Sequence, residues 1–153
     1  MKKLIMLVAA MALLALGGVA LAGGGGKKEK KAKFDSEITL SYSQGPSDPY
    51  DPYYEEAVFT GQVSATATNR RARKLGTAKC EKKRTVVIRN IDDPNSSAYA
   101  VVRTDNDGNY SADATEAAEE PGTYRARVFK KVKVAQNIKC QGDQSNEVEV
   151  PTP

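Results

Sequence analysis

Carboxylates are the side chains of this 153-residue chain that could carry catalysis, because it contains no histidine. Without histidine the usual general base, the usual zinc ligand and every Ser-His-Asp or Cys-His arrangement are excluded. Chemistry by paired carboxylates is still available in principle. The candidates lie beside prolines and glycines, where exposed carboxylates are ordinary: Asp48, Asp51, Glu55, Glu56, Asp105 and Asp107. We therefore expect a protein that is not an enzyme and that uses no cofactor.

The segment Asp105-Asn106-Asp107-Gly108 resembles part of a calcium-binding loop. The motif is incomplete, because Arg103 stands where the first ligand is required and no glutamate closes the loop. A hairpin turn explains the same residues, since Asp-Gly tolerates the positive φ that tight turns require. We expect a turn here, and a calcium site on Asp105 and Asp107 is the alternative.

A second acidic segment, residues 47–56, repeats the triplet Asp-Pro-Tyr and contains Tyr50, Tyr53 and Tyr54. Prolines restrict its backbone, and tyrosines bury a large area at little entropic cost, as in loops that recognise a protein or glycan. A plain connecting loop whose tyrosines cover the core is the simpler explanation. The three tyrosines are our candidate partner-binding residues.

Cys80 and Cys140 are the cysteines of the chain. In an exported protein they are expected to pair, which would close a loop of about 60 residues and contribute roughly 4 kcal/mol of stability. A reactive free thiol and an intermolecular bridge are the alternatives.

Residues 1–22 have the three parts of a cleavable secretory signal: two lysines, an apolar run over residues 4–16 and small residues that end at Ala22. No cysteine near Ala22 can carry a lipid, and residues 149–153 offer no second apolar segment. We therefore expect a secreted or extracytoplasmic protein, free or associated with the cell surface, without stable membrane insertion.

Residues 23–33 consist mainly of glycine and lysine, which predicts a flexible linker because they bury little apolar surface. As an alternative, the lysines form a basic arm that is attracted to anionic wall polymer or lipid headgroups. The pI of about 9.0 arises mostly from the leader and this tract, since residues 34–153 hold 16 basic and 18 acidic residues. We therefore expect no nucleic-acid partner.

From Phe34 onward, apolar residues recur at every second position between clusters of turn-forming residues, as in an all-β domain. Strands are predicted over residues 37–42, 59–65, 86–88, 98–103, 110–112, 122–132 and 146–150. In the fifth and sixth of these the residues expected to point inward are Tyr110, Ala112, Tyr124, Ala126 and Val128, with Arg125 and Arg127 between them pointing outward. No long amphipathic helix is available to cover a parallel sheet. We therefore expect a seven-stranded antiparallel immunoglobulin-like β-sandwich over residues 34–150, followed by a tail of residues 151–153.

Two short motifs carry a resemblance to a known family. Residues 104–110, Thr-Asp-Asn-Asp-Gly-Asn-Tyr, and residues 121–126, Pro-Gly-Thr-Tyr-Arg-Ala, look like the T-D-x-x-G-x-Y … P-G-T-Y-x-A signature of carboxypeptidase-regulatory-like domains. The resemblance implies a transthyretin-like sandwich of bacterial secreted proteins that assists folding, adhesion or carbohydrate contact without catalysis. Tyr124 resembles the tyrosine-corner residue of such sandwiches, and Gly108 and Gly122 take structural roles within the motifs.

These expectations combine into a secreted, non-catalytic, monomeric module that binds an unknown extracellular protein or glycan at or near the cell surface. A calcium-stabilised adhesive module is the alternative from a different class.

Overall fold

The structure, a computed structural model, describes residues 30–48, 51–95 and 97–152. The predicted signal peptide, most of the predicted linker and Tyr50 lie outside the described residues. Most of the described chain forms strands, arranged in two sheets, so the prediction of an all-β sandwich is confirmed at that level.

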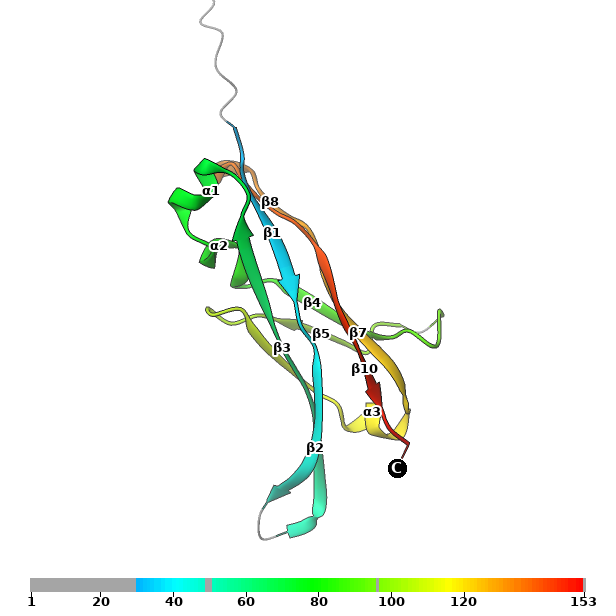
Figure 1. The fold of residues 1–153 in the computed structure, drawn as a ribbon. Coiled ribbons are helices and arrows are strands. Elements are labelled where there is room, and N and C mark those ends of the chain that lie inside the picture. Colours follow the sequence, from blue (N-terminus) through cyan, green and yellow to red (C-terminus); the bar gives the residue numbers. More distant parts are fainter. Residues whose placement is uncertain (1–29, 49–50, 96, 153) are drawn as a thin grey trace, which may run out of the picture.

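The first sheet has six strands and is built around β3 (Asp51–Ala67), which runs along most of the molecule (Figure 1). β2 (Ser41–Asp48) pairs with the first part of β3, and β1 (Ala32–Ile38) pairs with its last part. β6 (Asn109–Asp113) pairs with the middle of β3. β9 (Ile138–Cys140) pairs in parallel with β1, and β8 (Lys131–Lys133) forms the edge. β3 thus connects every part of this sheet.

The second sheet has four strands in the order β10 (Asp143–Val150), β7 (Gly122–Val128), β4 (Thr85–Asn90) and β5 (Ala100–Arg103). All of its pairings are antiparallel. Short helical segments connect the strands: α1 (Arg70–Leu75), α2 (Ala78–Glu81), α3 (Thr115–Glu119) and the 3-10 turn η1 (Val134–Gln136). Asn69 caps α1, because its side-chain oxygen accepts a 2.9 Å hydrogen bond from the backbone N–H of Ala72.

The main core lies between the two sheets and contains inward residues of both. Its centre is Phe59, whose ring centroid lies 5.6 Å from that of Tyr42, 5.7 Å from that of Tyr99 and 5.1 Å from that of Tyr124. The tilted and edge-on ring arrangements are the favourable ones for aromatic pairs. The predicted inward sets of β6 and β7 are buried as expected: Tyr110, Ala112, Tyr124, Ala126 and Val128.

A second, smaller core lies at the end of the molecule where β1 begins. It consists of Ala32, Phe34, Ala65, Ala72, Cys80, Ile138 and Cys140. Ala32 and Phe34 are fully buried in it. The predicted linker boundary is therefore corrected: Ala32 and Lys33 already belong to β1, because the alternation that buries Phe34 extends back to Ala32.

The described residues contain ten strands where seven were predicted. The predicted strand over residues 37–42 is divided at Leu40, whose N–H and carbonyl are both bonded to the side chain of Asn146, at 3.0 and 2.9 Å. The predicted strand over residues 122–132 is divided after Val128, because β7 and β8 belong to different sheets. β9 was not predicted, and its parallel pairing with β1 departs from an all-antiparallel sandwich.

The turn over residues 104–109 also differs from the prediction of a hairpin. It joins β5 to β6, and these two strands lie in different sheets. The turn itself forms as the sequence indicates, since Gly108 has a φ of 87°. A side chain at Gly108 would in addition collide with the carbonyl of Val63, whose N–H donates to the Gly108 carbonyl at 2.8 Å. A glycine is therefore required where the chain crosses between sheets.

Candidate binding surface

Cys80 of α2 and Cys140 of β9 form a disulfide, as the sequence predicts, with their Cα atoms 5.5 Å apart. Both cysteines are fully buried. The bond joins two segments separated by 60 residues and closes the small core beneath α1. Its burial indicates a structural cross-link and not a reactive site.

Arg84, which sequence analysis did not single out, is 1% exposed and holds the disulfide end to the rest of the sandwich. Its guanidinium donates hydrogen bonds to the carbonyls of Cys80 (2.6 Å), Phe129 (2.8 Å) and Gln141 (2.8 Å), and to the hydroxyl of Ser36 (3.2 Å). Burial lowers the pKa of Arg84. These acceptors are neutral and come from four separate segments, so the role of Arg84 is cross-linking.

Asp105 uses its carboxylate to form the turn between β5 and β6. Its Oδ1 accepts hydrogen bonds from the backbone N–H groups of Asp107 and Asn109, both at 2.9 Å. Its Oδ2 accepts from the Asn109 side chain at 3.3 Å. Desolvation tends to raise the pKa of the Asp105 carboxyl, but the hydrogen bonds outweigh it and the pKa is lowered. Across the described residues, no three potential metal ligands lie close enough together to hold an ion, so Asp105 and Asp107 are not part of such a group.

The tyrosine segment is a hairpin and not the loop that the sequence predicts. The backbones of Tyr53 and Tyr54 lie in β3, which pairs with β2 as far as Asp48 opposite Asp51. The described structure ends at Asp48 on one side and resumes at Asp51 on the other, so Tyr50 is not described. The β2–β3 hairpin extends to the end of the molecule opposite α1 (Figure 1).

Tyr124 is fully buried, and its hydroxyl donates a 2.9 Å hydrogen bond to the carbonyl of Glu120, four residues upstream. Gly122, of the same motif, is the first residue of β7 and lies against the side chain of Asn90. Tyr99, which the sequence analysis did not select, contacts the Tyr124 ring edge-on with centroids 5.5 Å apart. These residues hold the end of the sandwich beside α3.

The outer face of the second sheet carries four arginines. In β7 the buried Tyr124, Ala126 and Val128 alternate with Arg125 and Arg127, which therefore face outward. The strand pairings place two further arginines on the same face, Arg89 of β4 and Arg103 of β5. Arg89 lies directly opposite Arg125 in the β4–β7 pairing. Like charges in opposite positions destabilise a sheet, so the packing of the fold does not explain this pair.

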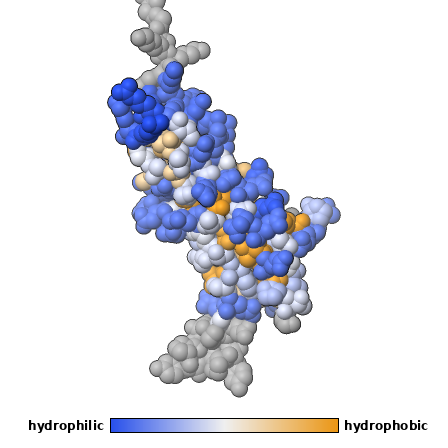
Figure 2. Space-filling model, in the orientation of Figure 1, coloured by the Kyte–Doolittle hydropathy of each residue, from blue (hydrophilic) through white to orange (hydrophobic). Residues whose placement is uncertain are grey.

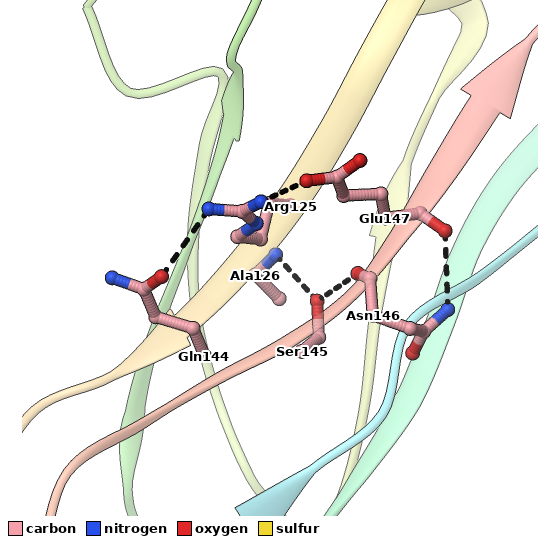
Figure 3. A network of polar contacts seen from close by, with 6 residues as sticks. All are labelled: Arg125, Ala126, Gln144, Ser145, Asn146 and Glu147. Carbon is pink, nitrogen blue, oxygen red and sulfur yellow. Dashed lines mark hydrogen bonds and ion pairs between the residues drawn. The ribbon is translucent and has the colours of Figure 1, made fainter.

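A β-bulge in β10 supplies polar partners for Arg125 (Figure 3). Gln144 pairs with Arg127, and Glu147 pairs with Arg125. Between these two pairs β10 has two residues and β7 has one, so β10 contains one extra residue. The buried hydroxyl of Ser145 fills the interruption by accepting a 2.9 Å hydrogen bond from the Ala126 N–H. Arg125 consequently donates to Gln144 at 3.3 Å and forms an ion pair with Glu147. The bulge thus holds the Arg125 guanidinium in a fixed place.

Apolar side chains lie exposed among these arginines. Val101 is 63% exposed and Phe129 is 46% exposed, and the guanidinium of Arg127 lies 5.0 Å from the centre of the Phe129 ring. We call this surface the arginine face; it consists of Arg89, Arg103, Arg125, Arg127, Val87, Val101 and Phe129. A pocket of about 230 Å³ crosses it, lined by Val87, Arg89, Ile91, Arg125, Arg127, Phe129 and Gln144. Together these side chains can bind an anionic partner that also offers apolar surface.

Within the part of the chain that the structure describes, no helix has the length and apolar character to cross a membrane. Comparison with known proteins found no match: no family model matches the chain, and no curated protein or solved structure is significantly similar to it.

Proposed function

We propose that the protein is an exported, non-catalytic module that binds a protein or a glycan at or near the cell surface, and that it does so through the arginine face. The observation that carries the proposal is the placement of the exposed Arg89 directly opposite the partly exposed Arg125 in the second sheet. In the free protein the Glu147 carboxylate offsets part of the repulsion through its ion pair with Arg125, and an anionic group bound between the two guanidinium groups would offset the rest.

The chemistry of the arginine face favours a partner that presents carboxylates. Arginine binds carboxylates in a planar, bidentate arrangement. The contact of Arg127 with the Phe129 ring already restricts the Arg127 side chain, so that less conformational entropy is lost on binding. Arginine and aromatic residues also dominate the energetic centres of protein interfaces. An acidic protein segment or a uronic-acid glycan meets these requirements.

Export of the protein is part of the proposal. The leader over residues 1–22 is of the cleavable kind, and the Cys80–Cys140 disulfide is of the kind that persists outside the cytoplasm. The fold we propose is that of a transthyretin-like, immunoglobulin-like sandwich. We expect the exported protein to begin at Gly23 and to be monomeric, which its intact mass and its elution from a sizing column test.

Tyr53 and Tyr54 are the second proposed contact, because tyrosines bury a large area at little entropic cost and the backbones of both residues lie in the β2–β3 hairpin. The calcium alternative has less support, since both oxygens of the Asp105 carboxylate already accept hydrogen bonds from its own turn.

The test is binding of the exported protein to polyglutamate and to an array of carboxylated and neutral glycans. We expect binding to carboxylated ligands, and Arg89→Ala with Arg127→Ala should weaken it by about tenfold or more, since charge-assisted hydrogen bonds contribute roughly 1.5–3 kcal/mol each. The matched control replaces Arg73 of α1, an exposed arginine outside the arginine face.

Equal binding of neutral and carboxylated ligands, or equal losses in the double variant and in Arg73→Ala, would contradict the assignment of the arginine face. Replacing Tyr53 and Tyr54 by serine in the same assay separates the two proposed contacts. A loss of binding in the tyrosine variant alone would move the site to the hairpin.

A further inference from the structure

The charges of the described residues are segregated along the molecule. Residues 30–33, 68–84 and 130–139 hold fifteen lysines and arginines and one carboxylate, Glu81. The rest of the described chain holds four basic residues, which are the arginines of the arginine face, and seventeen acidic ones. The near-neutral balance of residues 34–153 therefore hides two regions of opposite charge.

The three basic segments adjoin one another, and we call the surface formed by their cations, other than the buried Arg84, the basic end. The Asn69 side chain donates a 2.8 Å hydrogen bond to the carbonyl of Lys31, which joins α1 to the start of β1. Lys131 donates through its Nζ to the carbonyl of Lys83 at 3.0 Å, which joins β8 to the segment after α2. Figure 2 shows the most hydrophilic surface gathered over α1.

The cations of the basic end repel one another. The pKa of Lys131 is lowered, by desolvation first and then by the positive charges of Lys133, Arg84, Arg103 and Lys83. Glu81 is the one carboxylate of the three basic segments, and it accepts a hydrogen bond from the backbone of Ala65. An external surface with many negative charges would relieve this repulsion.

Two exposed valines distinguish the basic end from a purely electrostatic patch. Val134, in the turn between β8 and β9, is 77% exposed, and Val132 is 42% exposed. The turn is a defined structure: Asn137 closes it with a φ of 51°, and the Asn137 carbonyl accepts a 2.7 Å hydrogen bond from the N–H of Ala32. The ordered turn thus presents Val134 to the surroundings, next to β8, where Val132 lies between Lys131 and Lys133.

We propose that the basic end binds the surface of an anionic phospholipid bilayer, with Val134 entering the headgroup region and the surrounding lysines and arginines contacting phosphates. Cations around an exposed apolar tip are the combination by which peripheral proteins bind such surfaces. A soluble polyanion would use the cations alone and would leave the valines in water. This binding uses a surface other than the arginine face, so the latter stays available for the proposed partner.

The test is co-sedimentation of the exported protein with vesicles of phosphatidylcholine alone or with about 30% phosphatidylglycerol. We expect binding to the anionic vesicles that weakens as salt is raised. Arg70→Ala with Lys74→Ala should weaken it about 30-fold, on the basis of about fivefold for each basic residue near the surface. Val134→Ser removes two methyl groups and should weaken binding by about fourfold for each methyl group that enters the apolar region.

Two control variants are matched to these changes. Val101→Ser replaces another exposed valine, and Arg89→Ala with Arg127→Ala removes two cations, all on the arginine face. Both controls should bind vesicles as the unchanged protein does. In turn, Val134→Ser should still bind polyglutamate or carboxylated glycans, so that failure of this inference and failure of the proposed function can be told apart.

Equal binding to both kinds of vesicle would overturn the inference. A second pair of results would also overturn it: Val134→Ser and Val101→Ser bind anionic vesicles with equal affinity, and soluble polyphosphate displaces the protein from those vesicles. That second outcome would assign the basic end to a soluble phosphate polymer.

Discussion

The guanidinium of Arg84 donates a 2.6 Å hydrogen bond to the carbonyl of Cys80, one half of the disulfide. The same guanidinium reaches the carbonyl of Gln141, which directly follows Cys140. The covalent link and the buried cation therefore hold the same two segments, α2 and the end of β9. Through Phe129, Arg84 also holds the chain where it leaves β7 for β8.

Replacing Arg84 by methionine is expected to destabilise the protein by about 2–4 kcal/mol, because it removes a donor from the buried carbonyl of Cys80 and from the partly buried bonds to the carbonyls of Phe129 and Gln141. Methionine has a similar length, so the change tests hydrogen bonding more than volume. The free energy of unfolding is measured by urea denaturation, with the exposed Arg103→Met as control, for which a change within about 0.5 kcal/mol is expected. A loss below about 1 kcal/mol for Arg84→Met would contradict the cross-linking role.

Reduction of the disulfide is expected to lower the free energy of unfolding by about 4 kcal/mol, the chain-entropy value for a closed loop of 60 residues. Because the small core beneath α1 is built around this bond, its residues should lose protection from amide hydrogen exchange before those around Phe59 do. Urea denaturation with and without reductant gives the first quantity. Equal midpoints in the two conditions would show that the second core is stable without the bond.

Gly61 is expected to tolerate no side chain. A Cβ at this position would overlap the Thr39 carbonyl and the Tyr110 hydroxyl, which are hydrogen-bonded to each other. Gly61→Ala should therefore cost about 1–3 kcal/mol through overpacking. Gly45→Ala is the matched control, since nothing lies within 4 Å of a Cβ there. It should be neutral or slightly stabilising, and similar losses in the two variants would contradict the steric argument.

Alternation of apolar residues identified the strands whose two faces differ. Tyr124, Ala126 and Val128 are buried as predicted, because β7 has the core on one side and solvent on the other. The same alternation does not identify Ala32 as a strand residue, because Ala32 lies among lysines and such a tract is typical of an exposed linker. The assignment of β5 and β6 to different sheets could not be predicted either, because turn residues specify local backbone and not the partner of each strand.

The candidate surfaces were harder to predict than the strands. The outward positions of Arg125 and Arg127 followed from the alternation, but their meeting with Arg89 depends on the register of β4 against β7. The basic end depends on three segments far apart in sequence, so a net charge for the whole domain concealed it. Arg84 follows Lys82 and Lys83, and only the fold distinguishes this buried cation from its exposed neighbour Lys83.

Acid is expected to weaken the turn that Asp105 forms. The pKa of Asp105 is lowered in the folded protein, so its ionised carboxylate contributes stability above about pH 4, and this contribution is lost as the pH falls through the folded pKa. Asp105→Asn should therefore lower the urea midpoint at about pH 7 and differ less from the unchanged protein at about pH 2. The control is Asp107→Asn, since Asp107 bonds to Asp105 through its backbone N–H and not through its carboxylate. A midpoint difference for Asp105→Asn that is the same at both pH values would show that the charge of Asp105 does not stabilise the turn.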